Sequence, residues 1–383
     1  MLIFYPRTTD SPLVTPLVLI DALCSDDRFS TKEIAFLVKQ CAPQLADPIG
    51  LLPHKVFSTE YEWSYSRSNA DPAQAKQSDF TGMIKSPPAE FVSAFSPAWF
   101  LSAQNLDQMQ DAANKIANAQ TAYVHASACA RAVDGKTLKL DFVAYRAESV
   151  PDPFGVSTTM ILHGALIDDV ILTRIESGFT LNDKELLTVQ LTRLASAFGF
   201  TTEFSLPSNF VFPVSKKVFP PQTLNRMLGG ICYQNKLLFY MDYETKVIRF
   251  YSQGPGGVPK GRPLTSLQKL SFLGAGGRLL ISNFSVSNFA QANFATQFFP
   301  VQPFDSLLLI NDAKSGVFEG ATVAQKAGKF DVFLYYVLSY AYRWSRELYE
   351  LQISATNNWV LSQNKVDALL ASNVWKAAIE RAP

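Results

Sequence analysis

Few residues in this chain have both the type and the spacing that catalysis requires. His163 lies five and six residues before two carboxylates, Asp168 and Asp169. A histidine close to carboxylates can act as a general base or help to hold a metal ion. No second histidine is near in the sequence, and the intervening Gly-Ala-Leu-Ile is typical of a structural segment. We therefore expect no catalytic residue and no metal site, with an enzyme of unfamiliar type, working through these three residues, as an alternative.

Two glycine-containing motifs fall short of nucleotide-binding signatures. The sequence DGKT at 134–137 ends like a phosphate-binding loop, but Ala130 stands where the first glycine should be. The residues that follow alternate as in a strand, whereas a phosphate-binding loop leads into a helix. The sequence GAGG at 274–277 lacks the GxGxxG spacing and precedes an apolar run, which is more typical of a turn. The chain is therefore expected to bind no cofactor.

The four cysteines form no pattern that would hold a metal or a set of disulfides. Cys24, Cys41, Cys129 and Cys232 lie far apart, and none belongs to a CxxC motif. The simplest interpretation is that they are buried free thiols in a reducing compartment.

The apolar segments are too short to cross a membrane. The most apolar run, 332–342, is bounded by Asp331 and Arg343 and is far shorter than the ~20 residues that a helix needs to span a bilayer. The N-terminal MLIFYPRTTD lacks a basic region followed by a long apolar core. We expect no signal peptide and no membrane partner.

The net charge of +1 is unevenly distributed along the chain. Residues 201–280 hold ten basic and three acidic side chains, a net charge of +7, whereas residues 1–110 have a net charge of −4. Basic side chains interleaved with aromatic ones suit single-stranded nucleic acid, which makes a nucleic-acid-coating protein a second hypothesis. Because the total charge is close to zero, RNA would be only a weak partner. The candidate nucleic-acid-facing residues are Lys216, Lys217, Arg226, Lys236, Arg249, Lys260, Arg262, Lys269 and Arg278.

Helix start signals and apolar residues three or four apart predict a mainly helical chain. Ser30-Thr31-Lys32-Glu33 is a capping box, in which Ser30 and Glu33 satisfy free backbone amides at a helix start. The segment 330–351 is apolar on nearly all sides, which predicts a helix buried in a core or between subunits. Further helices are expected after Thr15-Pro16, at 104–131, after Asn182 with Glu185, and at 365–381.

Strands are expected to be the minority. Partly alternating or short apolar runs occur at 138–145, 237–243, 246–251, 278–283 and 306–310. The stretch 53–100 is expected to be irregular, with aromatic anchors. We therefore predict an α+β, mainly α-helical fold. Residues 1–204 and 311–383 would form the helical main body, and residues 205–310 a smaller, basic, strand-containing subdomain.

The composition favours a protein that associates with itself. Hydrophobic residues make up 48% of the chain and charged residues 17%, compared with about 25% charged in an average domain. Interfaces are similarly poor in charge and rich in aromatic side chains. The pair Asn-Phe recurs at 283, 288 and 293, a period of five that matches neither helix nor strand. It is either an irregular core segment or an arm that inserts into a neighbouring subunit. The candidate subunit-interface residues are Phe284, Phe289, Phe294, Phe298, Phe299, Tyr336, Tyr340 and Trp344.

In layout and composition, the chain resembles the coat proteins of small double-stranded RNA viruses of the partitivirus and picobirnavirus kind. They are of similar size, mostly helical, and rich in phenylalanine and proline. The resemblance implies a homodimer that builds a closed icosahedral capsid, with a helical shell domain and residues 205–310 as a possible protrusion. It also implies a viral RNA genome held with few wall contacts, and a location in the virion and host cytoplasm. A self-assembling structural protein, and not an enzyme, is therefore the first of the three hypotheses.

Overall fold

The structure is a computed structural model that describes separate segments of the chain between residues 1 and 357. The described residues are 1–6, 15–21, 28–41, 54–68, 78–94, 124–151, 157–166, 179–183, 185–206, 217–219, 224–235, 237–242, 246–252, 268–274, 278–287, 291–303, 305–314, 323–327 and 329–357.

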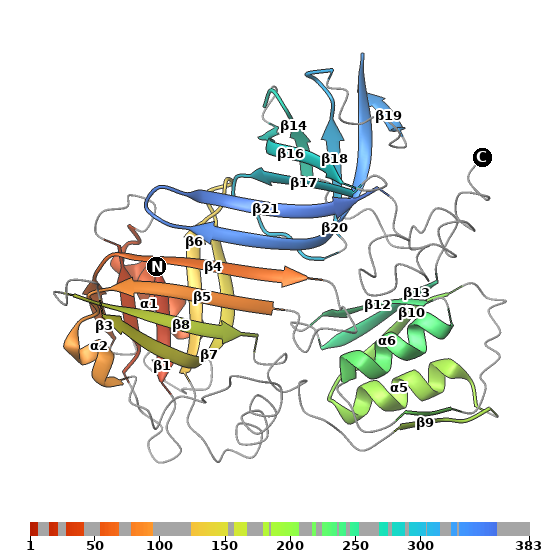
Figure 1. The fold of residues 1–383 in the computed structure, drawn as a ribbon, viewed down its shortest axis with the longest axis horizontal. Helices are drawn as coiled ribbons and strands as arrows, with labels where there is room; N and C mark the ends of the chain where they lie inside the picture. The colour runs from red at the N-terminus through yellow and green to blue at the C-terminus, as the bar shows by residue number, and fades with distance from the viewer. Residues whose placement is uncertain are drawn as a thin grey trace.

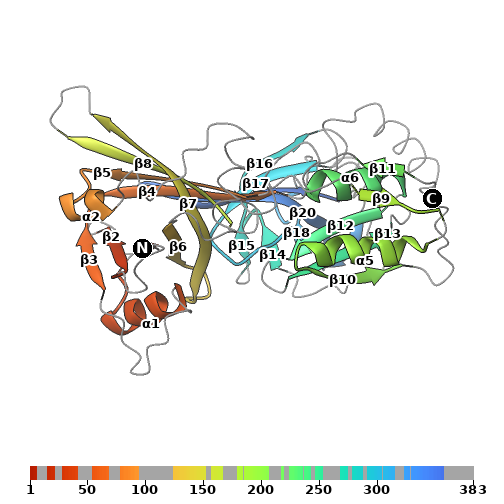
Figure 2. The same cartoon turned by 90° about the horizontal axis from the view of Figure 1, so that it is seen from below.

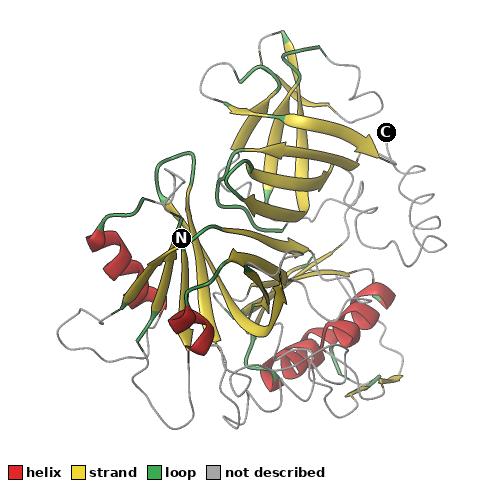
Figure 3. Cartoon of the chain, turned by 60° about the vertical axis from the view of Figure 1, so that its left-hand side comes forward, coloured by secondary structure: helices red, strands yellow, loops and turns green. Residues whose placement is uncertain are grey.

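The described residues are mainly in β-strands, so the predicted mainly α-helical class is wrong. Strands account for 58% and helices for 16% of them. The helices lie at the periphery of the sheets (Figure 3). The largest sheet has sixteen strands and follows the order β15-β14-β18-β20-β4-β5-β8-β7-β6-β1-β2-β3, with β16, β17, β19 and β21 attached to it.

The N-terminal part of this sheet curls around an aromatic core. Phe4, Phe80 and Phe142 point into this core and are almost fully buried. The rings of Phe4 and Phe91 meet edge to face at 5.4 Å, which fixes helix α2 against the sheet. Helix α1 packs on the opposite face of β1 and β6 (Figure 1). The elements are β1 (Leu2–Pro6), β2 (Leu17–Ile20), α1 (Thr31–Cys41), β3 (Lys55–Ser58), β4 (Tyr61–Ser68), β5 (Ser78–Lys85), α2 (Ala89–Ala94), β6 (Val124–Arg131), β7 (Thr137–Pro151) and β8 (Thr158–Ala165).

The C-terminal strands close into a barrel. Neighbouring strands pair in the order β14-β18-β20-β21-β17-β16. Strand β15, which leads directly into β16, pairs with β14 and so completes the ring. Only Ile281 separates β15 from β16, and its N–H donates to the Ser271 carbonyl at 3.0 Å. Closing the ring removes free strand edges. The elements are β14 (Gln268–Ser271), β15 (Leu279–Leu280), β16 (Ser282–Ser287), β17 (Gln291–Thr296), β18 (Ser306–Ile310), β19 (Val323–Ala327), β20 (Phe330–Trp344) and β21 (Tyr349–Thr356).

A smaller α/β unit has its own core. Its sheet has the order β10-β13-β12, with β10 parallel to β13, and α5 and α6 pack beside it (Figure 2). Leu187, Leu191, Leu228, Ile231 and Phe250 form the centre of this core. The elements are β9 (Phe179–Leu181), α5 (Leu187–Ala197), β10 (Thr201–Ser205), β11 (Lys217–Phe219), α6 (Leu224–Gln234), β12 (Leu237–Asp242) and β13 (Val247–Ser252).

Several predicted helices are strands in the structure. The segment 330–351 forms β20 and the start of β21, because a strand with both faces covered is also apolar on all sides. Residues 124–131, the end of the predicted helix 104–131, form β6, and the rest of that segment lies outside the described residues. The residues after Thr15-Pro16 form β2. The stretch 53–100, expected to be irregular, contains β3, β4 and β5. The predicted helix 365–381 lies outside the described residues.

Local signals with a defined geometry are confirmed. The capping box opens α1, and β12 (Leu237–Asp242) and β13 (Val247–Ser252) form an antiparallel pair where strands were expected at 237–243 and 246–251. The run 306–310 is β18, and 138–145 lies within β7. Helix α5 follows Asn182 and Glu185 as expected, but Leu186 is its N-cap residue and makes no side-chain cap. Asn182 instead accepts and donates backbone hydrogen bonds with the Gln190 amide.

The division into a main body and a subdomain at 205–310 stays a prediction. Strands β14 to β18 lie in this range, and β17 and β18 pair with β21 and β20 outside it. Of the cysteines, Cys129 and Cys232 are buried and free, as expected. Burial raises the pKa of the Cys232 thiol well above its usual value. Among the described residues, no helix is both long and apolar enough to span a bilayer.

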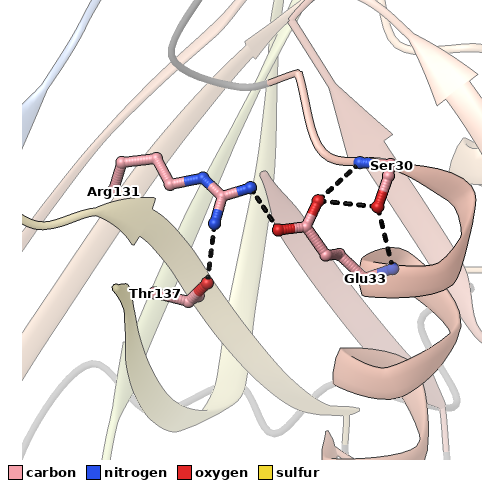
Figure 4. A network of polar contacts seen from close by, with 4 residues as sticks. All are labelled: Ser30, Glu33, Arg131 and Thr137. Carbon is pink, nitrogen blue, oxygen red and sulfur yellow. Dashed lines mark hydrogen bonds and ion pairs between the residues drawn. The ribbon is translucent and has the colours of Figure 1, made fainter. Parts of the chain in front are cut away.

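The capping box of α1 continues into an ion pair with β6 (Figure 4). The Ser30 N–H and Oγ–H donate to Glu33 Oε2, and the Glu33 N–H donates to Ser30 Oγ. Arg131 Nη2 donates to Glu33 Oε1 at 2.5 Å, and the guanidinium lies 4.4 Å from the Phe29 ring centroid. These donors, Arg131 first, lower the pKa of Glu33 from 4.5 to about 2.

This shift predicts an acid-dependent contribution to stability. Because the folded-state pKa is lowered, the contribution is complete above the unfolded value of 4.5 and is lost as the pH falls towards about 2. We expect the difference in melting temperature between the natural chain and Glu33→Gln to be constant near neutral pH and to shrink between these two values. A difference that does not depend on pH would show that the carboxylate charge is not responsible.

The barrel core predicts a large cost for truncating Phe294. This side chain is 3% exposed and stacks on Phe284 at 6.1 Å. We expect Phe294→Ala to lower the free energy of unfolding by about 3–5 kcal/mol. Val286→Ala, on the adjacent strand β16 and 40% exposed, should cost about 0.5 kcal/mol or less. Denaturant unfolding of both variants gives the comparison, and equal costs would contradict the burial of Phe294.

Candidate interaction surface

Small polar side chains cover one face of the large sheet where its two halves join. Successive side chains of a strand point to opposite faces. On β4, Tyr61, Trp63 and Tyr65 point into the core, so the intervening residues point outward. The same alternation on β20 and β21 places the outward residues of all three strands on one face. These outward residues are Glu62, Ser64, Ser66, Ser68, Ser339, Ala341, Arg343, Glu350, Gln352 and Ser354.

The strand register aligns these residues into rows. Ser68, Ser339, Ser354 and Asn293 are successive partners across β4, β20, β21 and β17. A second row contains Asp79, Ser66, Ala341, Gln352 and Ala295. A third row contains His163, Thr81, Ser64, Arg343 and Glu350. We call this surface, from β17 to β8, the polar face.

The polar face is hollowed at its centre. The hollow has a volume of about 680 Å³ and is lined mainly by serine, asparagine and glutamine residues. The Gln291 amide donates to Ser354 Oγ at 3.0 Å, which fixes one side chain at its rim. Neither histidine nor cysteine is among the described residues that line it. Hydroxyl and amide groups can donate and accept hydrogen bonds, but a serine nucleophile would also need an adjacent base.

The enzyme alternative receives little geometric support. His163 lies on β8, where its Nε2 is 3.8 Å from Glu148 Oε1, and Glu148 is also paired with Arg146. Asp168 and Asp169 lie outside the described residues. The DGKT sequence forms the turn between β6 and β7, in which Asp134 Oδ1 accepts the Lys136 N–H. Within the described segments, no three His, Cys, Asp or Glu residues are placed to hold a metal ion, and the expected lack of a metal site stays a prediction.

Only three of the candidate nucleic-acid-facing residues have described side chains, and the contact of the whole set with nucleic acid stays a prediction. Arg249 lies on β13, where its Nε donates to Glu203 at 2.8 Å. Lys269 is exposed on β14, and Arg278 is 3.9 Å from the buried Asp312 carboxylate. For Lys217 on β11 and Arg226 on α6, only the backbone is described. Lys216, Lys236, Lys260 and Arg262 lie outside the described residues.

The candidate interface aromatics are packed within their own chain. Phe294, Phe298, Phe299, Tyr336, Tyr340 and Trp344 are all 6% exposed or less. Phe284 is half-buried against the same core, and Phe289 lies outside the described residues. Intramolecular packing therefore accounts for the burial of these rings. Their contact with a second subunit stays a prediction.

Sequence analysis missed the polar face, although part of its signal is present in the sequence. The segment YEWSYSRS at 61–68 alternates large aromatic with small or charged residues, which is the pattern of a half-buried strand. Strands β20 and β21, which supply the facing residues of these rows, lie more than 200 residues away in the chain. Their alignment follows from the register and not from any local motif.

One buried arginine fixes the α/β unit beside the polar face. Arg67, at the end of β4, is 7% exposed, and its Nη2 donates to the Met241 carbonyl on β12 at 2.9 Å. Its guanidinium lies 5.7 Å from the centroid of the Tyr240 ring. Tyr240 in turn donates to Gln302 Oε1 at 2.9 Å and packs with Tyr251 and Tyr336. These contacts connect β12, β4 and the segment after β17.

Comparison with known proteins gives similar folds but no family. No family model matches the chain. No curated protein matches it either. The solved structures similar to it include the E. coli c3393 protein, a type VI secretion component described as similar to the T4 phage tail proteins gp27 and gp5. It has a TM-score of 0.46 and 11% identity over 82% of this chain and 76% of that chain.

Two further solved structures are similarly distant. A tail protein from Neisseria meningitidis has a TM-score of 0.44 and 10% identity, over 78% of this chain and 91% of that chain. The Francisella PdpA–VgrG complex has a TM-score of 0.42 and 9% identity, over 80% of this chain and 50% of that chain.

The expected identity as a double-stranded RNA virus coat protein is wrong. That resemblance implied a mostly helical shell domain, whereas the described chain is mainly β. The expected icosahedral capsid and the location in a double-stranded RNA virion in the host cytoplasm depended on that resemblance and are corrected with it.

The Arg67 contact predicts how firmly the α/β unit is held. Arg67→Met keeps the aliphatic length but removes the charged donor. We expect the free energy that holds β12 against β4 to fall by about 1.5–3 kcal/mol, the contribution of a hydrogen bond to a charged group. Amide exchange along 237–242 should then become at least about tenfold faster. Arg249→Met, which breaks the more exposed pair with Glu203, should change exchange little, because such pairs contribute about 0–1 kcal/mol. Equal exchange in both variants would contradict the role of Arg67.

Proposed function

We propose that this chain is a structural subunit of a tail-like assembly and associates with protein partners, including copies of itself, through the polar face. The tail and type VI secretion proteins with similar folds name the kind of assembly to test. Their likeness is too distant to transfer a function, so the physical argument depends on the polar face itself. The observation that carries it is the aligned rows of small polar residues across β17, β21, β20, β4 and β5.

Such a face suits contact with another protein surface. Most side chains at its centre are short, so another surface can approach the sheet closely there. Its backbone is held in place by the aromatic core on the opposite side, where Tyr61 stacks on Trp344 at 4.8 Å. A preorganised surface loses little conformational entropy when it binds.

We also propose that the chain is not an enzyme. The described residues that line the hollow in the polar face mainly carry hydroxyl and amide groups, with Arg67 and Asp79 as the charged ones and no histidine among them. An RNA partner is not part of the proposal, since Arg249, one of the described candidates, already pairs with Glu203.

The test is self-association of the purified chain, measured by light scattering after size exclusion and by sedimentation velocity. We expect oligomers that dissociate on dilution. Ala341→Arg places a long charged side chain at the centre of the polar face and should weaken association at least about tenfold, equivalent to 1.4 kcal/mol. Ser196→Arg, exposed on α5, is the matched control and should leave association unchanged.

Two outcomes would count against the proposal. If the natural chain stays monomeric at high concentration and also fails to bind a tail protein partner, the assembly role is excluded. If both arginine variants associate as the natural chain does, the contact lies elsewhere than the polar face.

A further inference from the structure

We propose that a cleft beside the first half of β7 binds an extended segment of another protein, which joins the sheet as an added strand. The proposal goes beyond association through the polar face, because the described residues that line this cleft include none of the outward residues of that face. It depends on three features: an open stretch of strand edge, a cleft along it, and a different environment on each side of that edge.

The first half of β7 has a strand on only one side in the described part of the chain. Residues 137–144 of β7 pair with β6, whereas β8 pairs with β7 only from Val143 onward. Strand β8 ends at Ala165, the partner of Val143. The edge of β7 before Val143 is therefore left without a described strand beside it.

The hydrogen-bond pattern of the β6–β7 hairpin shows which backbone groups face this edge. At the turn, the Ala132 N–H donates to the Lys136 carbonyl at 2.8 Å. In an antiparallel pair, the residues that exchange backbone bonds alternate along each strand. The even-numbered residues from 138 to 144 therefore bond to β6. The N–H and C=O groups of Lys139 and Asp141 point to the open edge.

A cleft of about 470 Å³ lies along this edge. Sites that hold drug-sized ligands have roughly 300–1,000 Å³, so the cleft can accept a short stretch of extended chain. Another of its walls contains Pro300, Val301 and Gln302. The Val301 N–H donates to the Tyr342 hydroxyl at 3.2 Å, and this hydroxyl donates to the Phe299 carbonyl at 2.7 Å. Because these bonds fix the wall in the free subunit, binding loses little conformational entropy.

The two sides of the cleft differ in polarity. On the side of the aromatic core it is lined by Tyr65, Leu140 and Tyr342. On the other side lie Lys139 and Asp141, whose Nζ and Oδ1 atoms are 3.0 Å apart, so the pair has no net charge. Alternate side chains of an added strand point to opposite faces. The occupant should therefore alternate apolar with uncharged polar residues.

Strand addition fits this site better than a small ligand does. The open edge offers main-chain donors and acceptors at the two-residue spacing of Lys139 and Asp141, and another extended chain presents the same spacing. In this mode of recognition the main-chain bonds supply affinity and the surroundings of alternate side chains supply specificity. Lys139 is held to its own strand by Asp141, so its side chain does not need to cross the edge.

Amide exchange measured by NMR tests the edge and its occupant together. In the free chain, we expect the Lys139 and Asp141 amides to exchange faster than those of Leu138 and Leu140, which bond to β6. The probe is the end-blocked peptide Lys-Thr-Val-Thr-Val-Thr-Lys in millimolar excess. It should slow exchange at Lys139 and Asp141 at least about tenfold. The same peptide with N-methyl groups on its five central residues lacks the donors and should have no effect.

A proline at position 139 separates the backbone from the side chain. The N–H of Lys139 is outside the β6 ladder, and strand edges tolerate proline, so Lys139→Pro should melt as the natural chain does. We expect it to bind the probe peptide at least about tenfold more weakly in calorimetric titration. Lys139→Ala is the matched control, because it keeps the amide, and should bind the peptide as the natural chain does.

Three results would overturn the proposal. The Lys139 and Asp141 amides could be as protected as their neighbours in the free chain, the peptide could fail to slow their exchange, or Lys139→Pro could bind the peptide unchanged. If Lys139→Pro does not fold, the exchange measurement on the natural chain decides. All of these results leave association through the polar face intact, because Ala341→Arg tests that contact separately.

Discussion

Strand β20 connects the two halves of the molecule, and the remaining large-sheet strands depend on its pairing. One edge of β20 pairs with β19 and then β21, and the other with β18 and then β4. A register shift between Val337 and Ser339 lies between the two sets of partners. The first part of β20 therefore belongs to the barrel, and the second part also belongs to the N-terminal sheet. Both faces of its first part are covered, whereas the polar face begins at Ser339.

This double role explains why the sequence of β20 is misleading. A strand covered on both faces has no alternation, so its sequence cannot be distinguished by period from that of a buried helix. Strand β6 misleads for a related reason. Ala126 and Ala128 face the aromatic core, while Cys129 faces α1 on the other side. Small residues on both faces are typical of close packing, in a strand as well as in the helix that was expected at 104–131.

Sequence patterns that involve only neighbouring residues predicted the local structure correctly. Features that depend on pairing between distant strands could not be predicted from such patterns. The capping box at Ser30 and Glu33 and the β12–β13 pair each need only a short segment of chain, and both are confirmed. The polar face requires Ser66 to lie beside Ala341, residues that are far apart in sequence. Only part of it was accessible, as the alternation along β4, and a stricter count of period-two patterns would have found that strand.

The fold also changes what the composition implies about association. We took abundant aromatic residues and low charge to mean that rings are buried between subunits, but Phe298, Tyr342 and Trp344 are buried within one chain. The low charge is instead consistent with an outer sheet surface whose centre is mainly serine, asparagine and glutamine, with a few charged residues such as Asp79, Arg343 and Glu350. Uncharged polar groups stay hydrated in a free subunit, yet they cost less to desolvate than charges when a partner binds. A surface of this kind favours contacts that are individually weak and reversible, and symmetry then decides whether many such contacts make a stable assembly.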